Sequence, residues 1–494
     1  MESATNHFNL VDEAWIPVAG VGLVSLARIF SDPGLRALGG NPVQKIALMK
    51  LLLAIAQAAA TPRDEAEWEA LGAEGLASKS SAYLIEKRDC FWLYGEKPFL
   101  QMKAIASADL ASYGSVTPSI STGNTTILTA SQIERIPDDP ERALVLVQLM
   151  GFGLGGKKTD NRVVLSAGYT GKTNDKGKPS TGKPGSSIGF LGFLHSFLIG
   201  PRLWDTIWVN LLTHQQIREH PVYISGLGPI PWETPPAGEA CPIAKKLQSS
   251  LMGRLIPFSR FVLLEEDGLR YSEGLAHPGY KEGGVDPSVA VSNTGKEPKV
   301  IWVDPEKRPW RMLTSLLSFI KAGSNDSFDC LSLRLAFPRV RKRWEEISLW
   351  SGGLRVSSNA GEQYVSGTDD YVESEIALPV TLMDRTWFEQ LKLEMDALDE
   401  LSKAIYGSCM GYHKALKVDG DMMARQASNL FWQLAERQFQ ALIDACNDAQ
   451  KAKDMRKIFA GYAQQAYDAF CPKDTARQLD AWAANMPHLG KYLA

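Results

Sequence analysis

The sequence predicts an α+β protein in which a large mixed α/β domain, residues 1–375, precedes an antiparallel four-helix bundle, residues 376–494. The length of 494 residues exceeds the roughly 250–300 residues that one hydrophobic core holds. Short strand-like and helical segments alternate with glycine- and proline-rich loops up to about residue 375. Beyond Leu382 glycine and proline become rare. Four periodic segments with short connections follow, which is typical of a helical bundle: Arg385–Met410, Ala424–Cys446, Asp448–Cys471 and Asp474–Met486.

In the first domain, the pattern FNLVDEAWIPV predicts a strand or hairpin edge over Phe8–Val18, with Trp15 in the core. An apolar helix is expected over Val43–Ala60, ended by Pro62, with Lys50 and Gln57 among its aliphatic residues. Further helices are expected at Ser78–Glu86, Arg142–Met150, Trp204–Leu212 and Trp310–Ile320, and strands at Cys90–Gly95, Leu255–Leu264 and Val300–Val303.

The composition indicates a soluble globular protein, with 45% hydrophobic and 22% charged residues. A net charge of −3 excludes a global basic field, so nucleic acid would have to bind at local patches. The six cysteines include no CxxC pair, and no Cys/His cluster has zinc-finger spacing, which favours reduced thiols. The start of the chain does not resemble a signal peptide. We therefore expect a cytoplasmic protein without membrane spans, metal or cofactor.

The stretch Gly168–Gly185 has a composition unlike the rest of the first domain. It carries five glycines, four lysines and a single acid, and it has no aliphatic residue to bury. Strand-like Val163–Ala167 precedes it and an apolar segment, Ser187–Gly200, follows it, so both ends are expected in the core. This pattern predicts a flexible basic loop suited to a polyanion.

A phosphate-binding enzyme using Gly171–Thr173 is one alternative, because a strand precedes Gly-Lys-Thr there. That pattern needs glycine where Ser166 stands, and it needs a helix whose amides cradle the phosphate, whereas the following residues cannot form one. The sequence has no HExxH motif, and His277 and His413 are expected to be surface groups or satisfied core groups. The sequence thus favours binding over catalysis.

The segment Arg334–Glu346 is dense in charge and includes Arg339, Arg341, Lys342 and Arg343. Such a run usually forms a solvated helix face, and we favour that interpretation over nucleic-acid contact. A glycine-punctuated turn follows at Ser351–Gln363, between strand-like segments.

Five motifs in order, NLVDEAWIPV, GEKPFLQMK, GFGLGG, WxxxWxNLL and SGGLR, together resemble the CasA-type large subunit of the type I-E CRISPR surveillance complex, Cascade. The resemblance covers essentially the whole chain. It implies a non-catalytic subunit, with other Cascade subunits as partners, located at the 5′ handle of the guide RNA. Such a subunit recognises the protospacer-adjacent motif (PAM) on double-stranded DNA, helps to open the duplex and recruits the helicase-nuclease.

The resemblance also assigns residues. It places DNA contacts in the glycine-rich loop, at one cation and in the turn after Gly352-Gly353, namely at Gly168, Gly171, Lys172, Lys176, Gly177, Lys178, Gly182, Lys183, Arg270, Arg355, Ser357, Ser358 and Asn359. It places guide-RNA-handle contacts within the polar segment Ser119–Ile133, at Thr122, Asn124, Thr125, Thr126 and Gln132. The turn departs from the family pattern GGxRNNQ, because this chain has GGLRVSSN and lacks the expected glutamine, and Arg270 stands in for an expected lysine. A purely architectural subunit, with the basic loop as a solvated insertion, remains an alternative.

Overall fold

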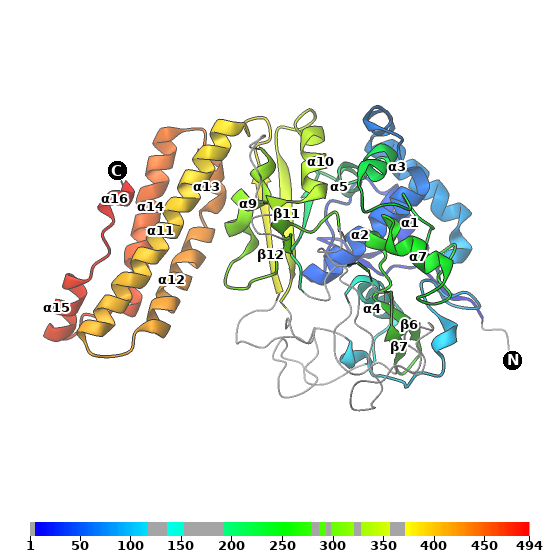
Figure 1. The fold of residues 1–494 in the computed structure, drawn as a ribbon, viewed down its shortest axis with the longest axis horizontal. Helices are drawn as coiled ribbons and strands as arrows, with labels where there is room; N and C mark the ends of the chain where they lie inside the picture. The colour runs from blue at the N-terminus through cyan, green and yellow to red at the C-terminus, as the bar shows by residue number, and fades with distance from the viewer. Residues whose placement is uncertain are drawn as a thin grey trace. The chain divides into compact units, whose positions relative to one another are not determined.

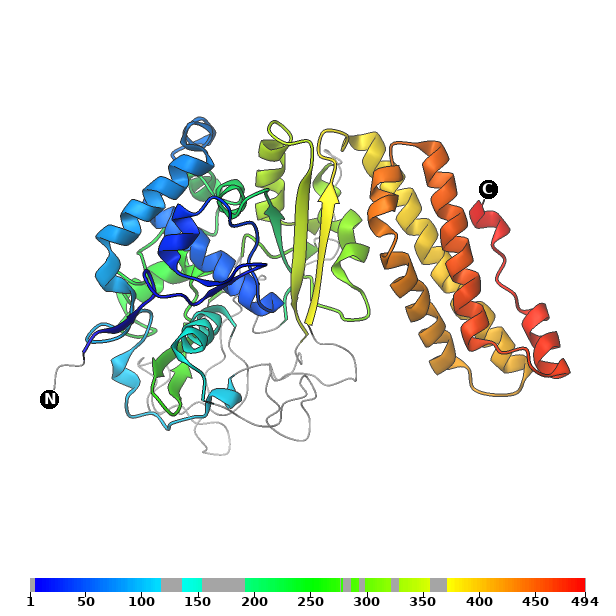
Figure 2. The same ribbon diagram turned by 180° about the vertical axis from the view of Figure 1, so that it is seen from behind.

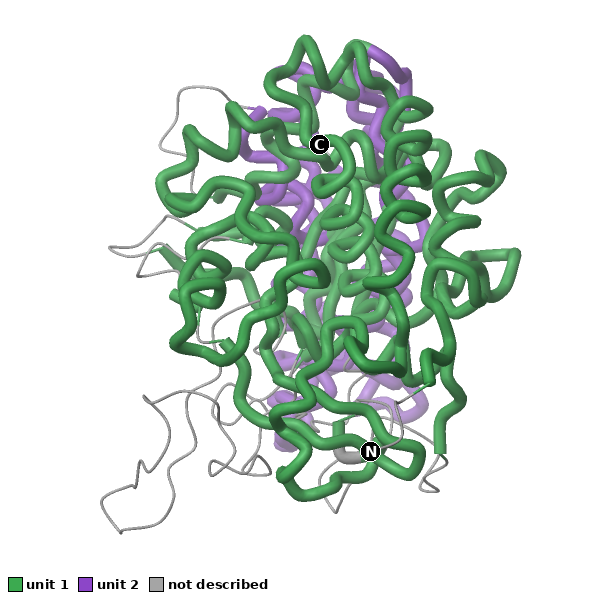
Figure 3. The backbone as a smooth tube through the Cα atoms, turned by 90° about the vertical axis from the view of Figure 1, so that its right-hand side faces the viewer, with its two compact units in different colours: residues 1–310, 326–342, 347–375 green, residues 311–325, 343–346, 376–494 purple. Residues whose placement is uncertain are grey.

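The computed structural model describes residues 5–116, 136–152, 192–275, 277–278, 286–292, 298–320, 328–355 and 371–493. The chain forms two compact units (Figure 3). The first, here the α/β unit, comprises Met1–Trp310, Asp326–Lys342 and Ile347–Glu375. The second, here the helical unit, comprises Ile376–Ala494 together with two earlier segments, Arg311–Asn325 and Arg343–Glu346.

The α/β unit is built around helix α2 (Pro42–Ala60) (Figure 1). Asn41 and Gln44 form a capping box at its start, Pro42 occupies the first turn, and the helix ends just before Pro62, as the sequence predicts. It is long and apolar enough to cross a membrane, but 72% of its most apolar window is buried inside the protein. Helices α3 (Glu65–Glu86) and α4 (Asp139–Gly151) pack on it, which identifies α2 as a core helix.

Five small sheets are present in the described part of the chain. The largest strands belong to the sheet β12–β11–β5, formed by β5 (His195–Ile199), β11 (Ile347–Leu354) and β12 (Tyr371–Leu378); β11 and β12 lie side by side in Figure 2. The other strands are β1 (His7–Asn9) with β4 (Trp92–Tyr94), β2 (Ile16–Val18) with β3 (Gly22–Val24), β6 (Arg260–Leu264) with β7 (Leu269–Glu273), and β8 (Val291–Ser292) between β9 (Lys299–Val300) and β10 (Phe328–Asp329). The strand or hairpin edge expected over Phe8–Val18 is confirmed at its two ends, in β1 and in β2, which pairs with β3, whereas residues 10–13 turn; Trp15 is fully buried, as expected.

The other α-helices in the described residues of this unit are short: α1 (Leu26–Ser31), α5 (Leu203–Val209), α6 (His214–Glu219), α7 (Pro242–Gln248), α8 (Met252–Leu255) and α10 (Leu331–Val340). The strand predicted for Leu255–Leu264 is wrong in its first half. Helix α8 ends at Leu255, Pro257 follows, and Phe258 has a positive φ of 48°, so the chain turns before β6 begins at Arg260.

The helical unit contains α11 (Arg385–Ala415), α12 (Asp421–Glu436), α13 (Phe439–Ala445), α14 (Ala449–Phe470), α15 (Ala476–Ala484) and α16 (Gly490–Leu493). Helices α11, α12 and α14 pack on one another. The predicted stripe on α11, Trp387, Leu391, Leu398 and Ile405, is buried. Glu394 of the same helix is buried too, and its carboxylate accepts a 2.8 Å hydrogen bond from Arg456 of α14.

Two predictions for the helical unit need correction. The single helix expected over Ala424–Cys446 is divided, because α12 ends at Glu436 and α13 starts at Phe439. The helix expected over Trp310–Ile320 is a series of short turns around α9 (Leu313–Leu316). Arg311 in this segment lies 3.7 Å from the ring centre of Trp432 on α12, which is a cation–π contact.

Candidate nucleic-acid interface

Two of the segments assigned to DNA start or end at one apolar cluster of the α/β unit. Val43 of α2, Phe152 and Leu354 are buried together, and Tyr371 packs against them. Phe152 is the last described residue before the segment that contains the basic loop, and Tyr371 follows the segment 356–370, which Leu354 precedes by one residue. We call these four residues the apolar base. It brings together positions that lie more than 200 residues apart in the sequence.

The described chain resumes after the basic loop beside the end of β11. Gly352 of β11 pairs with His195 of β5, and Val303 N donates to Gly192 O at 2.8 Å. A Cβ atom built on Gly353 would lie 2.8 Å from Phe193 O and 2.6 Å from a methyl group of Val303. Gly353 is therefore required for the close approach of the strand end to Phe193.

The variant Gly353→Val is expected to destabilise the α/β unit by about 1–3 kcal/mol, because the added side chain must displace backbone at Phe193. Chemical denaturation monitored by tryptophan fluorescence measures the change. Gly407→Ala is the control, since nothing lies within 4 Å of a Cβ atom there and the substitution improves helix propensity. Equal stability of the Gly353→Val protein and the parent would contradict the packing argument.

Residues on both sides of the predicted handle-binding segment contact the turn of the β6–β7 hairpin. Tyr113 donates its hydroxyl hydrogen to Glu265 O at 2.7 Å. Arg142 of α4 donates to Glu266 O at 2.8 Å and to Asp139 at 2.7 Å, and its guanidinium lies 5.9 Å from the Tyr113 ring centre. The β6–β7 hairpin thus anchors the chain at Tyr113 and at Arg142, on either side of the predicted handle-binding segment.

Arg270 belongs to the same hairpin, on β7. It donates to the carboxylate of Glu265 at 2.5 Å and to Ala108 O, and the hydrogen bond to Glu265 raises the pKa of the guanidinium. The Arg270 side chain is 24% exposed. A DNA phosphate at Arg270 would therefore compete with Glu265, and the assignment of this residue to DNA stays a prediction.

The other assigned residues are placed as follows. Arg355 directly follows β11 and is half-buried. The residues assigned to DNA in the basic loop and the turn, Gly168, Gly171, Lys172, Lys176, Gly177, Lys178, Gly182, Lys183, Ser357, Ser358 and Asn359, lie outside the described residues, as do the handle residues Thr122, Asn124, Thr125, Thr126 and Gln132. The segment Gly171–Thr173 of the phosphate-binding alternative lies outside them too. Their roles stay predictions.

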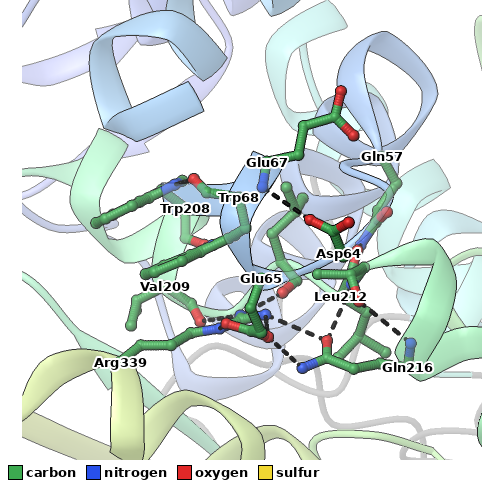
Figure 4. Close-up of polar contacts among 12 residues, drawn as sticks. Gln57, Asp64, Glu65, Glu67, Trp68, Trp208, Val209, Leu212, Gln216 and Arg339 are labelled. Atoms are coloured by element: carbon green, nitrogen blue, oxygen red, sulfur yellow. Dashed lines mark hydrogen bonds and ion pairs between the residues drawn. The ribbon is translucent and has the colours of Figure 1, made fainter. Parts of the chain in front are cut away.

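The interpretation of the charged run as a solvated face is wrong for Arg339 (Figure 4). This residue of α10 is 4% exposed. It donates to Val209 O at 3.1 Å and Leu211 O at 2.6 Å, which satisfies carbonyls at the end of α5, and it pairs with Glu65 at 2.7 Å. Its guanidinium lies 4.4 Å from the ring centre of Trp68, which stacks on Trp208. Arg341, Lys342 and Arg343 are exposed, as expected.

A second buried polar network was not predicted. Lys50 of α2 donates to Asp286, and Asp286 accepts from the Ser288 hydroxyl at 2.8 Å. His195 Nδ1 lies 2.9 Å from the same hydroxyl oxygen. This order differs from a catalytic relay, in which the imidazole lies between hydroxyl and carboxylate. All four side chains are buried, so the network joins α2, β5 and the Asp286 segment as a structural core. The signal in the sequence was a lysine among aliphatic residues of α2.

The fold of this chain is shared with solved structures of CRISPR-associated proteins. The crystal structure of Thermobifida fusca Cse1 matches with a TM-score of 0.75 at 20% identity, over 99% of this chain and 98% of that chain. The crystal structure of CasA from Thermus thermophilus matches with a TM-score of 0.71 at 20% identity, over 98% and 99%. A chain of a CRISPR RNA-guided surveillance complex matches with a TM-score of 0.69 at 14% identity, over 98% and 99%.

At these identities the structural likeness establishes the fold, and the family follows from the sequence profile. The profile of the CRISPR-associated protein Cse1 matches residues 9–490. The chain therefore belongs to the Cse1 family, and the resemblance to CasA-type proteins is confirmed. No match was found among curated proteins.

Proposed function

We propose that this chain is a non-catalytic subunit of a type I-E CRISPR surveillance complex that recognises the PAM on double-stranded DNA. The observation that carries the proposal is the apolar base, together with Gly353 and Phe193, at which the segments assigned to the minor groove and to strand separation start or end. A protein that recognises the PAM and also opens the adjacent duplex needs these two elements close together. Membership of the Cse1 family supports the same function.

The chemistry of the basic loop suits this role. Glycines allow the backbone to approach base edges closely, and the minor groove distinguishes bases poorly, so the loop would read a short and permissive motif. Lysines in the loop would contact phosphates and position the protein without adding sequence information. Pairing between guide RNA and target supplies the remaining specificity, as in other RNA-guided systems.

The proposal includes the rest of the assembly. The polar segment Ser119–Ile133 would bind the 5′ handle of the guide RNA, and the chain would act in the cytoplasm beside other Cascade subunits. The domain of residues 376–494 would act as an antiparallel four-helix bundle that docks neighbours, while the domain of residues 1–375 contacts nucleic acid and the complex recruits the helicase-nuclease. The net charge of −3 is compatible with this, because the guide complex would contribute much of the DNA contact.

Deletion of Asn174–Ser180 tests this proposal against the architectural alternative. The chain is co-expressed with the other Cascade subunits and guide RNA, and DNA binding is measured on targets with and without the PAM. We expect the shortened chain to assemble normally and to lose at least about tenfold in affinity for the PAM-containing target, because phosphate and groove contacts are removed. Unchanged PAM-dependent binding by the assembled complex would favour a purely architectural subunit.

A further inference from the structure

One side-chain cluster in the helical unit has the composition of a metal site. Cys409 and His413 of α11 and Cys471 at the end of α14 each place a potential ligand atom within 4.8 Å of the other two. Cys409 and His413 are four residues apart on one helix and therefore share a face. Cys471 lies 58 positions after His413 in the sequence. A search for zinc-finger spacing therefore could not have found the cluster.

We propose that Cys409, His413 and Cys471 bind a single transition-metal ion, with Zn²⁺ as the best chemical match. Two sulfurs and an imidazole nitrogen form a donor set typical of zinc. In a tetrahedral zinc site such atoms lie about 3.5–3.8 Å apart, so movements of about 1 Å would close the observed cluster around an ion. With three protein ligands, a water molecule would complete the tetrahedron.

The surroundings of His413 favour this role. Its Nε2 lies 3.2 Å from Phe470 O, and because a carbonyl oxygen only accepts, Nε2 carries the hydrogen. Nδ1 then keeps its lone pair as the nitrogen able to bind a metal. Metal-binding histidines commonly donate their second ring N–H to a carbonyl in this way, which fixes the tautomer and the ring orientation. The ring also lies close to Gly420: a Cβ atom there would lie 3.0 Å from His413 Cγ and 3.2 Å from His413 Cδ2.

The two thiols are protected and the imidazole is partly accessible. Cys409 and Cys471 are fully buried, whereas His413 is half-buried, so the open coordination position would lie on the histidine side. Tyr412 donates to Pro472 O at 2.5 Å beside the cluster, which joins the carboxyl ends of α11 and α14. A bound ion would strengthen this junction by linking both helix ends to one centre.

Metal analysis of the full chain tests the proposal. Protein dialysed against Zn²⁺ and then freed of excess metal is expected to hold one additional zinc relative to the Cys471→Ser variant by elemental analysis. Cobalt loading is expected to give sulfur-to-metal charge-transfer absorption that Cys409→Ser and Cys471→Ser lose. Cys446→Ser is the matched control, because Cys446 is also buried in the helical unit but lies outside the cluster.

A second variant keeps the test independent of thiol loss. Gly420→Val would displace the imidazole and leave both sulfurs in place, so we expect at least a tenfold weaker affinity for Co²⁺ with helix content unchanged by circular dichroism. Gly461→Ala serves as its control, since a Cβ atom there meets nothing within 4 Å. Zinc content equal in the parent and Cys471→Ser proteins, or a Cys409–Cys471 disulfide in protein purified without oxidant, would overturn the proposal.

Discussion

Replacing Lys172, Lys176, Lys178 and Lys183 with alanine is expected to weaken DNA binding by the assembled complex and to reduce its salt dependence. Each phosphate contact contributes about 0.9 to the slope of log affinity against log salt concentration. If all four lysines contact phosphates, the slope falls by about 3.6. A fourfold increase in salt would then cost the parent complex roughly 150-fold more affinity than the variant. Filter binding or fluorescence anisotropy over a salt series measures both quantities.

A variant with the same change in net charge provides the control. Lys79, Lys245, Lys246 and Lys307 are exposed residues of the α/β unit to which no role in DNA binding is assigned. Their replacement with alanine changes the overall field equally but removes no predicted phosphate contact. We expect the slope to stay close to the parent value. If both variants reduced the slope equally, the basic loop would have no special part in DNA binding.

Periodicity predicted the elements whose burial follows from local sequence. The cap and the proline around α2 define its ends, and the stripe on α11 is buried as expected. The interruption between α12 and α13 was missed because neither glycine nor proline marks it. Where caps, prolines and apolar spacing define a helix, its existence could be predicted; a break that no such residue marks could not.

The candidate site depended on long-range geometry to a greater extent. The segments assigned to nucleic acid were identified by resemblance. The apolar base beside them forms only because Phe152, Leu354 and Tyr371 pack together with Val43 of α2 in the folded chain. No local pattern encodes that meeting. Arg339 shows the same limit, because its burial is set by the carbonyls of α5, about 130 positions earlier in the chain.

Lys50→Met is expected to lower the free energy of unfolding by about 3–5 kcal/mol, the largest stability effect that we predict for a single substitution. Lys50 and Asp286 have side-chain exposures of 2% and 5%, so the substitution leaves a carboxylate buried without its cation. Burial opposes ionisation of Asp286, but Lys50, His195 and the Ser288 hydroxyl outweigh it and hold the pKa of Asp286 below its ordinary value. Equilibrium denaturation in urea at neutral pH measures the loss.

Lys45→Met is the matched control, because Lys45 lies on the same helix and pairs with Glu373 at 2.7 Å with side-chain exposures of 23% and 39%. Such a partly solvated pair contributes about 0–1 kcal/mol. The double variant Lys50→Met/Asp286→Asn should recover part of the loss, since the remaining amide carries no charge. The lowered pKa of Asp286 also fixes the sign of the pH dependence: the stabilisation is present above the unfolded-state pKa and is lost as pH falls through the folded-state pKa. Equal losses for Lys50→Met and Lys45→Met would contradict the conclusion that the buried Lys50–Asp286 pair matters more for stability than the partly solvated Lys45–Glu373 pair.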